Sequence, residues 1–94
     1  MLTPKQKATL KSKANRLKPV YQIGKDGLSD KLVDGLLSYL KAHELMKVSI
    51  LKNSFVSIGD VENMCDECGI EFVASIGHVL ILYMYSEELE DHVL

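Results

Sequence analysis

Two glycines flank a lysine and an aspartate in the segment Gly24-Lys25-Asp26-Gly27. A Gly-x-x-Gly turn of this kind lets the backbone approach a phosphodiester closely, because neither glycine has a side chain and each can adopt a positive φ. A short apolar segment precedes the turn and a predicted helix follows it, so backbone amides and a helix N-terminus could face a phosphate together. The glycines could equally serve only a turn, but the lysine between them favours phosphate contact.

The charges of the chain are divided sharply along its length. Residues 1–52 hold all eleven Lys and Arg residues and four acids, a net charge of +7, whereas residues 53–94 hold nine acids and no Lys or Arg, a net charge of −9. No acid occurs among residues 1–25, so the lysines there lack the ion pairs of an ordinary solvated helix. We therefore expect the basic half to face a polyanion such as RNA and the acidic half to face away from it.

Other residues capable of chemistry are less suitably placed. Cys65 and Cys68 are predicted near the C-terminal end of a helix beside two acids, where negative potential opposes thiolate formation, so we expect unreactive thiols. A zinc site would need two further ligands, and the only histidines downstream of these cysteines are His78 and His92. These two histidines and His43 lack a neighbouring nucleophile motif. We expect neither an enzyme nor a bound cofactor or metal.

Length and composition indicate one small domain over residues 1–94, because a chain of this size can bury one modest core. A hydrophobic content of 47% with 26% charged residues is ordinary for a folded protein. The N-terminus lacks the apolar segment of a signal peptide, and no stretch approaches about 18 consecutive apolar residues. We expect a cytoplasmic protein without membrane contact, and we interpret residues 87–94 as an acidic tail.

Periodicity and capping signals predict three helices and four strands. A capping box at Thr3 begins a helix that should run to about Leu17, with Leu10, Ala14 and Leu17 as its buried stripe. The fold class is therefore α/β: a two-layer domain of order α-β-α-β-α-β-β with a mixed four-stranded sheet, in which the first two strands are parallel and the last is interior. The other elements are expected as a strand over 20–23, a helix from Ser29 to about His43, a strand over 45–51, a helix from about Ser57 to Cys68, and strands over 72–76 and 79–85 joined by a tight turn at Gly77-His78.

Several segments match a known family in order along the chain. They are residues 2–7 (LTPKQK), 17–20 (LKPV), 22–28 (QIGKDGL) and 43–48 (HELMKV), and matches continue through Ile76-Gly77 and Leu82-Tyr83. Together they resemble the CRM domain, the chloroplast RNA splicing and ribosome maturation family, whose stand-alone prokaryotic members are of the YhbY type. The resemblance implies a fold similar to the C-terminal domain of a bacterial translation initiation factor, RNA binding, and a role in maturation of the large ribosomal subunit.

The chain departs from the pattern of that family at two positions. Members often have histidine where this chain has Asn15, and usually arginine where it has Met84. Without that arginine, residues 53–94 carry no fixed positive charge. RNA contacts should therefore rest on the N-terminal half.

We interpret the chain as a monomeric RNA-binding protein that contacts structured RNA, namely ribosomal RNA in pre-ribosomal particles, during assembly of the large subunit. The alternative is an adaptor whose acidic half docks a basic ribosomal protein. Lys52, at the outgoing end of a strand, is expected to contribute less than Lys25. The residues predicted to contact RNA are Gly24, Lys25, Asp26, Gly27, Lys5, Lys7, Lys11, Lys18 and Lys47.

Overall fold

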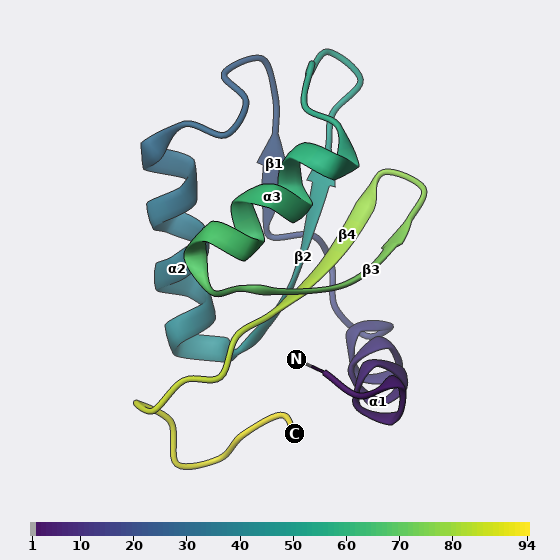
Figure 1. Ribbon diagram of the computed structural model, residues 1–94, viewed down its shortest axis with the longest axis vertical. Helices are drawn as coiled ribbons and strands as arrows, with labels where there is room; N and C mark the ends of the chain where they lie inside the picture. Colours follow the sequence, from purple (N-terminus) through teal and green to yellow (C-terminus); the bar gives the residue numbers. More distant parts are fainter. Residues whose placement is uncertain (1) are drawn as a thin grey trace.

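Three helices pack on a mixed sheet of four strands in the computed structural model, which describes residues 2–94 (Figure 1). The sheet order is β1-β2-β4-β3, in which β1 and β2 are parallel and the other neighbours are antiparallel. The fold class and the order of elements are as predicted. The elements are α1 (Pro4–Ala14), β1 (Tyr21–Ile23), α2 (Asp30–His43), β2 (Leu45–Ile50), α3 (Ile58–Cys68), β3 (Glu71–Ile76) and β4 (Val79–Tyr83).

Each helix begins at a capping residue that the sequence signals. At α1, Thr3 Oγ1 accepts a hydrogen bond from the N–H of Gln6 at 3.1 Å, and Gln6 Oε1 accepts one from the N–H of Thr3 at 2.9 Å. Ser57 and Asp60 form the same reciprocal box at α3, and the Ser29 hydroxyl caps α2. A cap of this kind stabilises a helix by about 1 kcal/mol, which fixes where each helix starts.

Helix α1 ends earlier than predicted. It stops at Ala14 rather than near Leu17, and the Leu17 side chain is 38% exposed instead of buried. The N–H of Asn15 is shared between the carbonyl oxygens of Lys11 at 3.1 Å and Ser12 at 3.3 Å, which tightens the last turn and closes the helix. The prediction failed at Leu17 because this turn carries the chain away from the helix axis toward β1.

Strand bounds differ from the predictions by one or two residues. The largest difference is at β4, which was expected to reach Tyr85 and ends at Tyr83. The N–H of Met84 donates to the carbonyl oxygen of Glu44 at 2.9 Å, and the next residues leave the sheet for the end of α2. The first strand begins at 21 rather than 20, and the second ends at 50 rather than 51.

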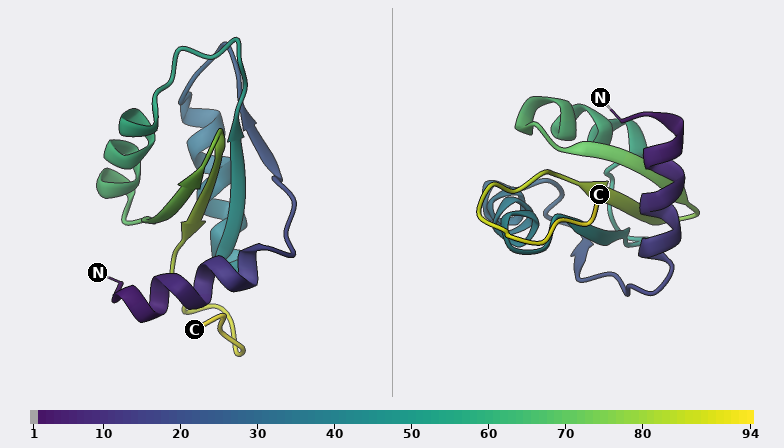
Figure 2. Two further views of the ribbon diagram at one scale, coloured as in Figure 1. Left: turned by 90° about the vertical axis from the view of Figure 1, so that its right-hand side faces the viewer. Right: turned by 90° about the horizontal axis from the view of Figure 1, so that it is seen from below.

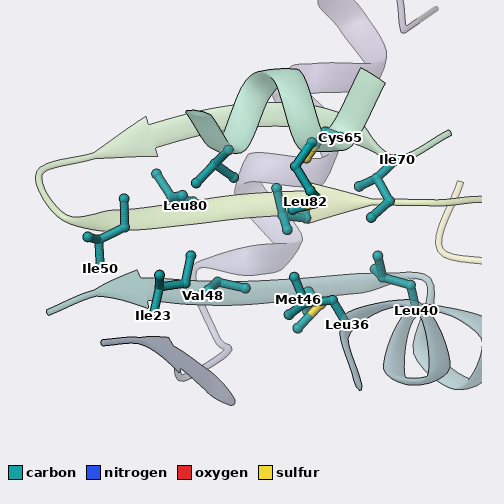
Figure 3. Packing of buried hydrophobic residues seen from close by; sticks show 12 residues of the cluster. Ile23, Leu36, Leu40, Met46, Val48, Ile50, Cys65, Ile70, Leu80 and Leu82 are labelled. Carbon is teal, nitrogen blue, oxygen red and sulfur yellow. The ribbon is translucent and has the colours of Figure 1, made fainter. Parts of the chain in front are cut away.

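The sheet buries apolar side chains on both faces. On one face α1 packs Leu10 and Ala14 against β4 and its neighbours, a partial third layer that covers only one end of the sheet (Figure 2). The central position of β4 between β2 and β3 explains why its residues are apolar on both faces. The larger cluster lies beneath α2 and α3 (Figure 3) and contains Ile23, Leu36, Leu40, Met46, Val48, Ile50, Val61, Met64, Cys65, Ile70, Leu80 and Leu82.

The long axis of the molecule separates two ends of the sheet (Figures 1 and 2). The parallel strands β1 and β2 both end at the top of Figure 1, where the loops of residues 24–29 and 51–57 lie. Helix α1 and the C-terminal segment lie at the opposite end in both views. Within residues 2–94, no helix combines the length and the apolar character that crossing a membrane requires.

Candidate nucleic-acid interface

The Gly-x-x-Gly segment forms a tight turn between β1 and α2. The N–H of Gly27 donates to the carbonyl oxygen of Gly24 at 3.1 Å, and the residues between them, Lys25 and Asp26, are exposed. Gly27 has a φ of +63°, a conformation that strains any residue with a Cβ atom. Gly24 lies outside that region, and a Cβ there would meet Leu51 at an ordinary 3.6 Å. The backbone therefore favours glycine at position 27, whereas at position 24 glycine only keeps the surface bare.

A depression of about 450 Å³ opens beside this turn, between β1 and the first half of α2. The ring of Tyr21 packs so closely against α2 at Gly35 that a Cβ on residue 35 would lie only 2.8 Å from the tyrosine hydroxyl. Lys31 in the first turn of α2 lines the depression together with Lys25. Sequence reasoning did not select Lys31, although a lysine two residues after the Ser29 cap must lie near the preceding turn. Two cations thus accompany the turn amides.

The loop between β2 and α3 (residues 51–57) lies against the glycine turn. The N–H of Leu51 donates to the carbonyl oxygen of Ile23 at 2.9 Å, and a Cβ on Gly27 would lie 3.3 Å from the Val56 side chain. Lys52 is exposed on this loop, between Leu51 and Asn53, the two residues that a Cβ on Gly24 would meet. From the sequence we expected Lys52 to contribute less than Lys25, without recognising that its loop adjoins the turn. The parallel pairing could have indicated this, because parallel neighbours end at the same edge of a sheet.

The lysines of α1 lie at the other end of the molecule from the turn (Figure 2). Lys5, Lys7 and Lys11 are exposed. Lys7 and Lys11 are four residues apart and share one flank of the helix, while Lys13 lies on the other flank and donates a hydrogen bond to the carbonyl oxygen of Val93. The flank with Lys7 and Lys11 is therefore the one that the C-terminal segment leaves open.

Lys18 and Lys47 link the two groups of cations. The carbonyl oxygen of Lys47 accepts a hydrogen bond from the N–H of Val20 at 3.0 Å, so the connection that carries exposed Lys18 runs beside β2. The molecule measures 36 × 25 × 22 Å. The predicted residues consequently form two groups near the ends of the long axis, with Lys18 and Lys47 between them, rather than one compact patch.

Acids border this surface on the side of α3. A groove of about 700 Å³ between α2 and α3 has an apolar floor and carries four carboxylates, without a single Lys or Arg among its lining residues. Two of these acids, Asp30 and Asp34, belong to the half of the sequence with net positive charge. The groove would repel phosphate. Its lining consists of Leu28, Asp30, Val33, Asp34, Val56, Asp60, Asn63, Met64, Glu67 and Cys68.

The C-terminal segment is held to the fold by Glu44, the residue after α2. Glu44 has a φ of 66°, and its side chain is fully buried. The carboxylate accepts hydrogen bonds from the N–H of Ser86 at 2.7 Å and the N–H of Val93 at 3.0 Å, and His92 Nδ1 lies 2.7 Å from Oε2. Burial alone would raise the pKa of Glu44, but these contacts outweigh it and hold the pKa below its ordinary value.

Sequence reasoning missed this anchor. Residues 87–94 were interpreted as an acidic tail, and the segment does carry exposed Glu87 and Glu88. However, it returns to the fold at His92 and Val93, and Val93 packs against the core beneath α1. The partners are 42 to 49 residues apart along the chain, so no local pattern signals them.

The two cysteines are free thiols, and Cys65 is buried in α3. Burial, with smaller contributions from Cys68 and the neighbouring acids, raises the pKa of Cys65 to about 12. A raised pKa disfavours the reactive thiolate form of Cys65, and the low reactivity of the two thiols stays a prediction. Among residues 2–94, no group of three or more His, Cys, Asp or Glu side chains is arranged to hold a metal ion.

Comparison with known proteins finds the same family that the sequence segments resemble. The family model of the CRS1/YhbY (CRM) domain matches residues 2–84. The chain is 40% identical over 89 residues to a Bacillus subtilis protein named a probable RNA-binding protein, YqeI, covering 94% of this chain and 93% of the relative. It is 35% identical over 88 residues to an RNA-binding protein of Haemophilus influenzae, covering 93% and 89%.

A solved structure has the same fold. It is the solution structure of a Staphylococcus aureus protein, SAV1595, for which RNA binding is suggested. The TM-score is 0.71 at 33% sequence identity, and the match covers 94% of this chain and 93% of the other.

Proposed function

Because the chain belongs to the CRS1/YhbY (CRM) domain family, we propose that it binds structured RNA through the glycine turn and the cations around it. The observation that carries this proposal is the convergence at one edge of the sheet. There the bare backbone of Gly24 lines one depression with exposed Lys25 and Lys31. The adjoining loop carries exposed Lys52 between Leu51 and Asn53, which a Cβ on Gly24 would meet. Phosphate is the ligand that such amides and cations bind together.

The proposed role of the turn is to hold one phosphate while the lysines contact its neighbours along the strand. Phosphate contacts supply affinity without reading sequence, so binding should depend strongly on salt. If about four phosphates are neutralised, the logarithm of affinity should fall with the logarithm of salt concentration with a slope of roughly −3, by analogy with the counterion release of DNA.

The second group of cations, on α1, favours an RNA that is long enough to reach both ends of the molecule. An RNA that touches both the turn and the flank with Lys7 and Lys11 must follow most of the 36 Å axis past Lys18 and Lys47. A structured RNA presents phosphates at fixed spacing over that length. The resemblance to ribosome-maturation proteins makes ribosomal RNA in precursors of the large subunit the proposed target.

The test compares two charge reversals, one in the turn before α2 and one in the last turn of that helix. Lys25→Glu should weaken binding to labelled large-subunit ribosomal RNA by about tenfold, since one phosphate contact becomes a repulsion. The salt dependence should also become shallower, with the slope changing from roughly −3 to roughly −2. Lys41→Glu, in the last turn of α2, is the matched control and should bind as the native chain does. Filter binding over a salt series measures both quantities. Equal affinities for the two variants would reject the turn as the RNA site.

The groove between α2 and α3 supports a second candidate function, that of an adaptor for a basic protein. Its apolar floor and four carboxylates suit a segment that carries both apolar and basic side chains. The two functions separate in one experiment. Asp34→Lys should lower cosedimentation with pre-ribosomal particles without weakening binding to naked ribosomal RNA if the groove docks a protein. If Asp34→Lys leaves cosedimentation unchanged, the adaptor is rejected.

A further inference from the structure

Phe55 is an exposed aromatic residue to which phosphate binding by the glycine turn and the lysines gives no role. Its side chain is 97% exposed, and the next most exposed large apolar residue among residues 2–94 is Ile76 at 61%. Single apolar residues on a surface are common, so exposure alone assigns no role. The position of Phe55 beside the proposed phosphate site is the feature that makes it informative.

The loop around Phe55 holds this side chain outward. The N–H of Ser54 donates to the carbonyl oxygen of Leu51 at 3.0 Å, and the N–H of Val56 donates to Ser54 Oγ at 3.2 Å. Val56 turns inward and packs against the core beneath α2 and α3, and Ser57 begins the cap of α3. Phe55 thus stands between two residues fixed by hydrogen bonds, one of which is also packed in the interior.

The same loop joins Phe55 to the glycine turn. Its inward neighbour Val56 is the residue that a Cβ on Gly27 would approach at 3.3 Å, and Asn53 lies near Gly24. Lys52 adds a cation on the same loop. One edge of the sheet therefore presents bare backbone, positive charge and an aromatic ring. Proteins that bind single-stranded nucleotides combine these same three features, with the ring stacking on a base.

We propose that Phe55 stacks on an unpaired base of the RNA strand whose phosphate the glycine turn binds. This inference rests on the proposed function of the turn. Bases in a continuous duplex are stacked on each other and are not available to a side chain, so the preferred RNA has a bulge or loop at this site. A phenyl ring cannot form the hydrogen bonds that distinguish bases, so the preference is for an unpaired base of any identity.

The experiment uses the full chain and two short RNA hairpins that differ by one bulged 2-aminopurine, whose fluorescence falls when it stacks. The native chain should bind the bulged hairpin more tightly and quench its fluorescence. Phe55→Ala should lose about tenfold in affinity for the bulged hairpin and abolish the quenching, with unchanged affinity for the paired hairpin. Phe55→Tyr should restore both. Tyr85→Ala is the control, because Tyr85 is an exposed aromatic at the opposite end of the sheet.

The outcomes separate the inference from the function on which it rests. If Lys25→Glu weakens binding of both hairpins but Phe55→Ala weakens neither, the turn binds RNA and the stacking proposal is wrong. Equal losses on both hairpins for Phe55→Ala would also reject stacking on an unpaired base. If Lys25→Glu has no effect on either hairpin, the proposed function fails and the inference fails with it.

Discussion

Helix α2 lies between two left-handed backbone positions, and the chain fills them in opposite ways. Before the helix, Gly27 has a φ of +63° and no side chain, so the turn stays open to solvent. After the helix, Glu44 has a φ of 66° and a side chain that is fully buried. Such a conformation costs a non-glycine residue roughly 1 kcal/mol or more, so glycine is the expected residue at both places.

The two ends of α2 differ in where their anion comes from. At Glu44 the anion is internal, because the carboxylate accepts hydrogen bonds from the N–H groups of Ser86 and Val93. At the glycine turn we propose an external anion, a phosphate of RNA. At Glu44 the hydrogen bonds to fixed partners within the fold offset the strain of the left-handed backbone. At Gly27 the absence of a side chain leaves the backbone accessible to a ligand that binds reversibly.

The largest effect should come from removing the carboxylate of Glu44. Glu44→Ala leaves buried N–H groups without an acceptor and should lower the free energy of unfolding by about 3 kcal/mol. Glu44→Gly loses the same hydrogen bonds but relieves the left-handed strain, so it should be more stable than Glu44→Ala by roughly 1 kcal/mol. Urea unfolding measures both. Equal stabilities of the two variants would show that the backbone at this position is not strained.

Acid should weaken this end of α2 through the same carboxylate. The pKa of Glu44 in the folded protein lies below the ordinary value of 4.5, so its stabilising contribution is complete above that value and is lost as the pH falls through the folded pKa. Thermal unfolding between neutral pH and pH 3 should therefore show a steeper loss of stability in the native chain than in Glu44→Gln. Parallel curves would mean that another carboxyl group controls the acid response.

The comparison also shows which features could be predicted from the sequence. The caps at Thr3, Ser29 and Ser57 and the Gly-x-x-Gly turn are local patterns, because hydroxyls and glycines act on atoms a few residues away. The interior position of β4 followed from a strand that is apolar on both faces.

Features that depend on distant contacts were not predictable in this way. The anchor at Glu44 needs partners beyond residue 85. The loop of Phe55 and Lys52 is different, because the parallel pairing of β1 and β2 that places it beside the glycine turn was itself predicted and the inference was not drawn. The separation of α1 from the turn depends on which face and end of the sheet the helix covers. Leu17 looked like a core residue because helical periodicity continues past the point where the helix ends.

The two glycines of the turn should respond differently to the same added methyl group. Gly27→Ala should lower the free energy of unfolding by about 1 kcal/mol, because position 27 is left-handed and the new Cβ would lie 3.3 Å from Val56. Gly24→Ala should keep the stability of the native chain but lower RNA affinity by roughly tenfold, equivalent to one lost hydrogen bond to a charged phosphate oxygen. Thermal unfolding and filter binding distinguish the two. Native affinity in Gly24→Ala would mean that phosphate does not approach there.

The smallest effect should come from the acids of the C-terminal segment, and it tests whether the second group of cations contacts RNA at all. Removing residues 87–94 would delete the contacts of Glu44 with His92 and Val93 and destabilise that end, so replacing Glu87, Glu88 and Glu90 by Gln is the cleaner change. These residues are at least partly exposed, at the end of the molecule where α1 lies (Figure 2).

If Lys7 and Lys11 contact RNA, the triple Gln variant should bind pre-ribosomal particles slightly more tightly at low salt, about twofold, and equally at high salt where such distant charges are screened. Reversing Lys7 and Lys11 to Glu should then reduce cosedimentation with the particles. If neither change alters cosedimentation, the glycine turn alone carries the RNA contact. If the Gln variant loses cosedimentation while the lysine reversals are silent, the acidic residues dock a basic protein and the RNA surface does not include α1.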